Sequence, residues 1–74
     1  MGFGNKVKLE RKKNSLSAEA LAVLCGVSRS YITLIENEKR LPGKKVIPKL
    51  ALALKLKTEE VINWYLEALR EKLH

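Results

Sequence analysis

The segment from Gly26 to Arg40, GVSRSYITLIENEKR, constrains the fold more than any other part of the chain. Turned at about 100° per residue from a start at Ser28, it forms a helix with two different sides. The apolar side carries Tyr31, Ile32 and Ile35. The opposite side carries small hydroxyls, one arginine and one leucine, in Arg29, Ser30, Thr33, Leu34 and Asn37. The apolar side therefore needs a core, while the other side is left for solvent or a partner.

A second helix is predicted directly upstream. Ser17 is a good N-cap, Glu19 favours the positive end of the helix dipole, and the segment stops at Gly26. A short turn between two helices needs a residue that tolerates positive φ, which Gly26 supplies. Ala22 is small enough for the two helices to approach closely. Residues 17–37 therefore have the expected geometry of a helix-turn-helix, whose second helix can present its outer side to DNA.

Three further helices are expected, and no segment shows the alternation of a strand. A short basic helix is predicted over Lys6 to Lys13. A fourth lies within Lys45 to Leu54, with Pro48 in its first turn, where a missing N–H costs little. The last helix is predicted from about residue 58 to 72. The 74 residues are expected to form one all-α domain with a small core.

The charge of the chain indicates the kind of partner. Fifteen lysines and arginines against eight acids give a net charge of +7. The stretch from Lys39 to Lys57 contains no acid at all, which favours a polyanionic partner over an ordinary solvated basic surface. A membrane surface is less favoured, because the bases do not form one face of a strongly amphipathic helix.

Several classes of function lack the residues they need. The sequence has no Ser-His-Asp set, no metal-spaced cluster and no glycine-rich phosphate loop, so we expect neither an enzyme nor a cofactor or metal. Cys25 is the only cysteine, and His74 has no second ligand nearby. The longest apolar run, Ala20 to Cys25, is far shorter than the ~20 residues that span a bilayer. Without a secretory signal, the expected location is the cytoplasm.

The stretch LSAEALAVLCGVSRSYITLIENEKRLP resembles the lambda-repressor/Cro-like (XRE-like) helix-turn-helix DNA-binding family. The matching positions are Leu16-Ser17, Leu21-Ala22, Gly26-Val27-Ser28, Ile32, Ile35-Glu36 and Pro42. The resemblance covers roughly Val7 to Ile62 and implies a five-helix domain, here with an extended C-terminal helix, that binds operator DNA as a dimer. It also implies a structural ion pair between Arg11 and Glu36, since an unpaired carboxylate at the edge of the core would be costly.

Four positions depart from the family pattern. Ala18 stands where the family usually has a phosphate-contacting Gln, and Leu34 where it often has a polar reader of bases. Glu38 and Lys55 stand where Gly usually closes the third and fourth helices. We therefore expect the fold to be retained and the sequence specificity to differ.

The DNA contacts follow from the predicted geometry and the resemblance. Arginine can grip guanine, hydroxyls donate and accept, and a leucine can cover a thymine methyl or belong to an interface. The residues expected to contact bases are Arg29, Ser30, Thr33 and Leu34. Phosphate contacts are expected at the helix starts and in the following loop, from Ser17, Ser28, Tyr31, Asn37, Lys39, Arg40, Lys44 and Lys45.

Two groups of apolar residues exceed what the family core needs. The last helix carries a stripe that we assign to a dimer surface, although packing over the first helix is an alternative. Its residues are Ile62, Tyr65, Leu66, Leu69 and Leu73. Val23, Leu24 and Leu52 stand at positions that are often polar, and they indicate either a slightly oversized core or a protein-binding patch.

These features predict a sequence-specific double-stranded DNA-binding protein that acts as a homodimer. We expect a transcriptional regulator without an effector domain, and a repressor rather than an activator. One alternative is a protein-interaction module of the antitoxin or anti-repressor type. The other is a nonspecific nucleoid binder.

Overall fold

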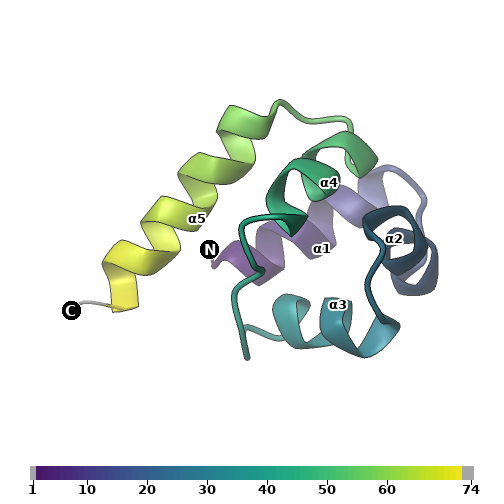
Figure 1. Ribbon diagram of the computed structural model, residues 1–74, viewed down its shortest axis with the longest axis horizontal. Helices are drawn as coiled ribbons and strands as arrows, with labels where there is room; N and C mark the ends of the chain where they lie inside the picture. Colours follow the sequence, from purple (N-terminus) through teal and green to yellow (C-terminus); the bar gives the residue numbers. More distant parts are fainter. Residues whose placement is uncertain (1, 73–74) are drawn as a thin grey trace.

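The computed structural model describes residues 2–72 and contains five helices (Figure 1). They are α1 (Phe3–Lys13), α2 (Ala18–Cys25), α3 (Arg29–Glu36), α4 (Val46–Ala53) and α5 (Thr58–Lys72). Residues 2–72 contain no strand, so the predicted all-α fold is confirmed. Pro48 is the third residue of α4, in the first turn as expected. The predicted dimer residue Leu73 lies outside the described residues.

The connection between α2 and α3 has the predicted turn chemistry. The Ser17 hydroxyl accepts a hydrogen bond from the Ala20 N–H at 3.0 Å, and the Ser28 hydroxyl accepts one from the Tyr31 N–H at 3.1 Å. Gly26 ends α2 in the left-handed conformation, with φ 68° and ψ 31°. The two helices meet at 111°, which is the angle of a helix-turn-helix.

The core lies between α1, α2, α3 and α4, and α5 closes it from one side (Figure 1). The side of α5 that packs on the core carries Val61, Trp64, Tyr65 and Ala68. The Phe3 ring meets Trp64 and Tyr65 edge to face, with centroid distances of 6.4 and 6.3 Å. α5 is therefore packed against the start of α1 through the rings of Trp64 and Tyr65. Ile62 and Leu66 take no part in these aromatic contacts.

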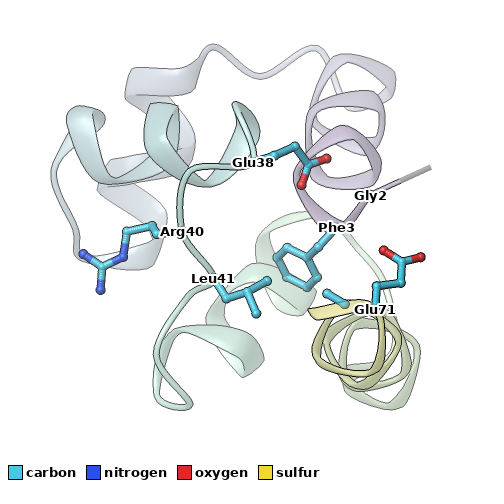
Figure 2. A pocket seen from close by; sticks show the side chains of 7 residues that line it. Gly2, Phe3, Glu38, Arg40, Leu41 and Glu71 are labelled. Carbon is cyan, nitrogen blue, oxygen red and sulfur yellow. The ribbon is translucent and has the colours of Figure 1, made fainter. Parts of the chain in front are cut away.

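The start of α1 differs from the prediction, because the helix begins at Phe3 and not at Lys6. The carboxylate of Glu38 accepts hydrogen bonds from the backbone N–H groups of Gly4 and Asn5, both at 3.1 Å (Figure 2). These groups have no partner within the helix, so a side chain distant in sequence supplies the missing N-cap. Gly4 lets the start of α1 approach the end of α3 this closely, since a Cβ there would overlap the carbonyl oxygen of Ile35.

Among residues 2–72, three residues other than glycine adopt the left-handed conformation, namely Ser15 with φ 55°, Glu38 with φ 61° and Lys55 with φ 58°. Glu38 and Lys55 end α3 and α4 at the two positions where the family usually has Gly. This conformation costs an L-residue about 1–2 kcal/mol. At Glu38 the cap on α1 offsets that cost, whereas Lys55 makes no side-chain hydrogen bond among the described residues.

Arg11 and Glu36 form the ion pair that the resemblance implies. The Arg11 Nε donates to Glu36 Oε2 at 2.7 Å, and Nη2 donates to Oε1 at 3.1 Å. The remaining Nη1 donates to the carbonyl oxygen of Leu16 at 2.8 Å. Both charged side chains are largely buried, so this bidentate pair connects α1 to the end of α3 and to the segment before α2.

Removing one member of this pair should strand a buried charge. Arg11→Met or Glu36→Gln is expected to lower the free energy of unfolding by about 3–5 kcal/mol. The double variant Arg11→Met/Glu36→Gln should lose clearly less than the sum of the two single variants, as measured by urea unfolding. Small and additive losses would contradict this role.

The two left-handed residues that follow α3 and α4, Glu38 and Lys55, should respond differently to replacement by glycine. Lys55→Gly removes strain only, and is expected to raise the free energy of unfolding by about 0.5–1 kcal/mol. Glu38→Gly also removes the cap of α1, which costs about 0.5–2 kcal/mol, so it should give no such gain. Glu38→Ala keeps the strain and loses the cap, and should be the least stable of the three variants in urea unfolding. A gain of similar size for Glu38→Gly and Lys55→Gly would show that the cap contributes nothing.

Candidate nucleic-acid interface

The outer side of α3 is an open surface. Ile32 and Ile35 on the inner side are buried, whereas the four predicted base-contacting residues are exposed. These four line one shallow depression of about 440 Å³, formed by Arg29, Ser30, Thr33 and Leu34. The structure therefore brings together on one helix face an arginine, two hydroxyls and an exposed leucine.

The starts of α2 and α3 present hydrogen-bond donors to solvent. The Ser17 and Ser28 oxygens accept from the helix backbone, which leaves each hydroxyl hydrogen free to donate to an anion. The first N–H groups of each helix also lack partners within the helix. At α2 the exposed Glu19 opposes an anion, and Ala18 offers no side-chain donor. An anion at this helix start could therefore be bound only by Ser17 and the backbone N–H groups.

The loop after α3 is attached to that helix at two points. The Tyr31 hydroxyl accepts a hydrogen bond from the Gly43 N–H at 2.9 Å. The Arg40 guanidinium lies over the Tyr31 ring at 4.5 Å from its centroid and points away from Phe3 (Figure 2). Tyr31, which was expected to contact phosphate, is half-buried and positions the loop. Its hydroxyl hydrogen remains available as a donor.

The other predicted phosphate-contacting residues surround this loop. Asn37 ends α3 with φ −90°, and its side chain is exposed. The basic side chains of the loop are also exposed, namely those of Lys39, Arg40, Lys44 and Lys45. Lys39 and Arg40 thus follow the C-terminal end of α3, and Lys44 and Lys45 follow Gly43, which binds Tyr31 of the same helix. Ser17 and Ser28 lie at the starts of α2 and α3.

The positive charge around α3 is not neutralised by neighbouring acids. In residues 2–71, the ion pairs are Lys6–Glu67, Arg11–Glu36 and Lys13–Glu10, and each involves α1. The carboxylate of Glu38 is bound at the start of α1. Arg29 and the loop bases join none of these pairs, so their field is available to a polyanion.

Cys25 is a buried side chain of the core. Burial raises the pKa of its thiol, an effect that the nearby Lys49 ammonium partly opposes. Because the thiolate is the reactive form, Cys25 is a poor nucleophile. In the described part of the chain, no three His, Cys, Asp or Glu side chains are grouped as metal ligands. No single helix of this part is long and apolar enough to cross a membrane, and only the bent pair α2 and α3 reaches that length and composition when counted together.

The apolar stripe of α5 is split between core and surface. Tyr65 packs on Phe3, whereas Ile62, Leu66 and Leu69 are exposed. Ile62, Tyr65 and Leu66 form one wall of a groove of about 310 Å³, and α4 forms the other together with Lys44 of the preceding loop. The second wall contains Ile47 and Pro48, which sequence reasoning missed because helical periodicity does not show which helices become neighbours.

Val23, Leu24 and Leu52 are not an extension of the core. They are 75%, 56% and 82% exposed, respectively, so the reading of a slightly oversized core is wrong. Leu24 and Leu52 line one hollow, and exposed apolar side chains that lie together usually mark a contact surface.

Comparison with known proteins identifies the arrangement. A helix-turn-helix family model matches residues 7–61. The chain is 38% identical over 72 residues to the HTH-type transcriptional repressor RghR of Bacillus subtilis (strain 168), which covers 93% of this chain and 53% of that protein. The chain spans about half the length of the curated relatives it matches.

Two solved structures show the same arrangement of helices. The restriction-modification controller protein C.AhdI from Aeromonas hydrophila is 37% identical, with a TM-score of 0.74 over 80% of this chain and 89% of that one. The biofilm master regulator SinR, solved in complex with DNA, is 26% identical, with a TM-score of 0.74 over 81% of this chain and 97% of that one.

The contact between Tyr31 and Gly43 can be tested without DNA. Tyr31→Phe keeps the ring under Arg40 but removes the acceptor for the Gly43 N–H. Loss of one hydrogen bond of about 1 kcal/mol should accelerate hydrogen exchange at the Gly43 amide about fivefold. Tyr65→Phe is the matched control, because no hydrogen bond of the Tyr65 hydroxyl is seen among the described residues. Unchanged exchange in Tyr31→Phe would show that the loop is held by other contacts.

Proposed function

Since the chain belongs to the helix-turn-helix family, we propose that it is a sequence-specific double-stranded DNA-binding regulator of transcription, and a repressor rather than an activator. The observation that carries this proposal is the exposed outer side of α3, beside lysine and arginine side chains that join none of the ion pairs described. The name of RghR and the DNA complex of SinR support the same function. We place this activity in the cytoplasm of a prokaryotic host, where the chromosome lies, and we assign no enzymatic step to it.

In the proposed complex α3 lies in the major groove. Arg29 stands at the first position of α3, from which a guanidinium can donate two hydrogen bonds to guanine. Ser30 and Thr33 can each donate to or accept from a base edge. Leu34 is 42% exposed, and the thymine methyl is the apolar feature of the groove that suits it.

Contacts to the DNA backbone fix the position of α3 in the groove. Ser17 and Ser28 can each donate a hydroxyl hydrogen to a phosphate beside a helix start. Tyr31 and Asn37 supply neutral contacts. The lysines and the arginine of the loop supply the positive charge. The attachment of the loop to Tyr31 holds these side chains close to α3 before DNA binds. Less conformational entropy is then lost on binding.

We further propose that the chain acts as a homodimer through the groove between α4 and α5. Ile62, Leu66 and Leu69 are exposed on one side of α5, and the adjacent wall of the groove is apolar. Because these side chains are only 37–51% exposed, a second α5 seated there would gain roughly half of the ~1.5–3 kcal/mol that complete burial of each is worth, before the cost of association. Two α3 helices could then meet half-sites about one DNA turn, ~34 Å, apart.

The proposed function is tested by selecting bound duplexes from a random pool and measuring affinity for the selected site against salt concentration. Neutralising about six phosphates should give a slope near −5 in a plot of log affinity against log salt. Equal binding of all duplexes would favour a nucleoid binder. A salt-independent affinity, or no binding to any duplex, would contradict the proposal and favour a protein-interaction module.

Base contacts and phosphate contacts should respond differently to mutation. Arg29→Ala should weaken binding to the selected site by about 1–3 kcal/mol and relax the preference at one position. Lys44→Ala should weaken all duplexes alike and make the salt slope shallower by about one. The measurement is fluorescence anisotropy with the selected duplex and with a scrambled one. If both variants lose affinity equally for both duplexes, α3 does not read the bases.

The dimer is best tested by substitution, because truncation within α5 would remove the aromatic contacts of Phe3. Leu66→Gln is expected to convert a dimer into a monomer at micromolar concentration. Since Leu66 is 51% exposed, the unfolding midpoint of this variant should match that of the unmodified chain when both are diluted far enough to be monomeric. Leu9→Gln on α1 is the matched control, at 46% exposure, and should remain dimeric. Analytical ultracentrifugation decides between the outcomes. A monomeric unmodified chain, or a dimeric Leu66→Gln variant, would place the interface elsewhere.

A further inference from the structure

An apolar hollow lies between α2 and α4. Leu24 of α2 lines it together with Lys49, Leu52 and Ala53 of α4, and these four residues are called the α2–α4 patch below. Its volume of about 230 Å³ is several times the roughly 30 Å³ that one water occupies in the liquid, so it can admit a side chain. Leu52 is 82% exposed and Leu24 56%. Such exposure of large apolar side chains in a small domain indicates a surface that is covered when the protein works.

The α2–α4 patch is separate from the two surfaces already assigned. The depression on α3 and the groove between α4 and α5 contain none of its residues. On α4, Ile47 and Pro48 belong to the groove with α5, whereas Lys49, Leu52 and Ala53 belong to the hollow with α2. A partner seated on the patch would therefore leave the reading residues of α3 uncovered.

The charge around the patch indicates the chemistry of the occupant. The Lys49 ammonium lies over the C-terminal end of α2, 3.7 Å from the point where a Cβ on Gly26 would be. Lys55 and Lys57 follow directly after the end of α4, and residues 39–57 contain no acid. A second copy of this patch would meet like charges, which disfavours pairing of the patch with itself. A partner segment that carries carboxylates beside an apolar side chain is favoured, because its carboxylates would meet the lysines and its apolar side chain would fill the hollow.

We propose that the α2–α4 patch docks an acidic amphipathic helix from a partner protein. One large apolar side chain of that helix enters between Leu24 and Leu52, and carboxylates on either side of it face Lys49. This is recognition of a helix in a groove, with the apolar anchor supplying affinity and the charges supplying selectivity. The bound partner and DNA occupy different surfaces, so both are held at once.

The test uses the full chain, labelled with ¹⁵N, and two synthetic amphipathic helical peptides as probes. The peptides share one pattern of leucines, and their polar positions are glutamate in one and lysine in the other. The glutamate peptide should shift the amide resonances of Leu24, Lys49 and Leu52 in a saturable manner, with and without a bound duplex. The lysine peptide should bind at least about tenfold more weakly.

Variants assign the effect to the patch. Leu52→Gln should weaken binding of the glutamate peptide about tenfold, as for a central interface residue, without moving the unfolding midpoint. Leu9→Gln should bind as the unmodified chain does. The proposal is overturned if the glutamate peptide gives no shifts, if both peptides bind equally, or if the shifts map to Ile62 and Leu66. It is also overturned if duplex DNA displaces the peptide, or if Leu24 and Leu52 shift with protein concentration alone.

Discussion

The guanidinium of Arg11 holds three parts of the chain together, and the presentation of α3 depends on it. It pairs with Glu36 at the end of α3 and donates to the Leu16 carbonyl just before α2, so the two ends of the helix-turn-helix are fixed to α1. Glu38, two residues further on, also reaches α1 and caps its start. Two carboxylates at one end of α3 are thus directed backwards into the domain. Because the helix is held from its inner side and its C-terminal end, its outer side needs no contact with the rest of the molecule.

Each helix is held from one side only, which explains how so small a domain offers several free surfaces. A chain of 74 residues buries a limited core, and here each helix gives one side to it and leaves another side free. The free side of α3 carries hydroxyls and Arg29, which suit base edges. The free sides of α4 carry apolar residues, Pro48 towards α5 and Leu52 towards α2. Charge separates the roles further, because four acids bind at α1, whereas Arg29 and the basic side chains of the loop join none of the described ion pairs. These acids are Glu10, Glu36, Glu38 and Glu67. Reading of DNA, pairing of subunits and docking of a partner can therefore occupy different faces.

Local signals made the central part of this fold predictable from sequence. The caps Ser17 and Ser28 and the left-handed Gly26 act within a few residues, so their roles follow from spacing alone. The start of α1 could not be found in this way, because its cap comes from Glu38, 33 residues away from Asn5. The helical period showed that α5 carries apolar side chains, but it did not show which of them meet the core. The buried and the exposed apolar residues occupy adjacent positions around the helix, as Val61 and Ile62 do. The α4 wall of the groove between α4 and α5 had no signal in the sequence either, because the period of one helix does not show which helix lies beside it. The four side chains expected to contact bases do share the predicted exposed face of α3, whereas their contacts with DNA stay a prediction.

The most direct test of base reading by α3 is an NMR measurement of contacts across the complex. The chain is labelled with ¹³C at its leucine methyl groups and bound to the duplex selected from the random pool. Nuclear Overhauser effects are then measured between these methyl groups and the protons of the DNA. If α3 lies in the major groove, the Leu34 methyls will show effects to thymine methyl or cytosine H5 protons, whereas those of Leu24 and Leu52 will show none. Effects to base protons from Leu24, Leu52 or Leu66, with none from Leu34, would show that another surface of the domain contacts the DNA.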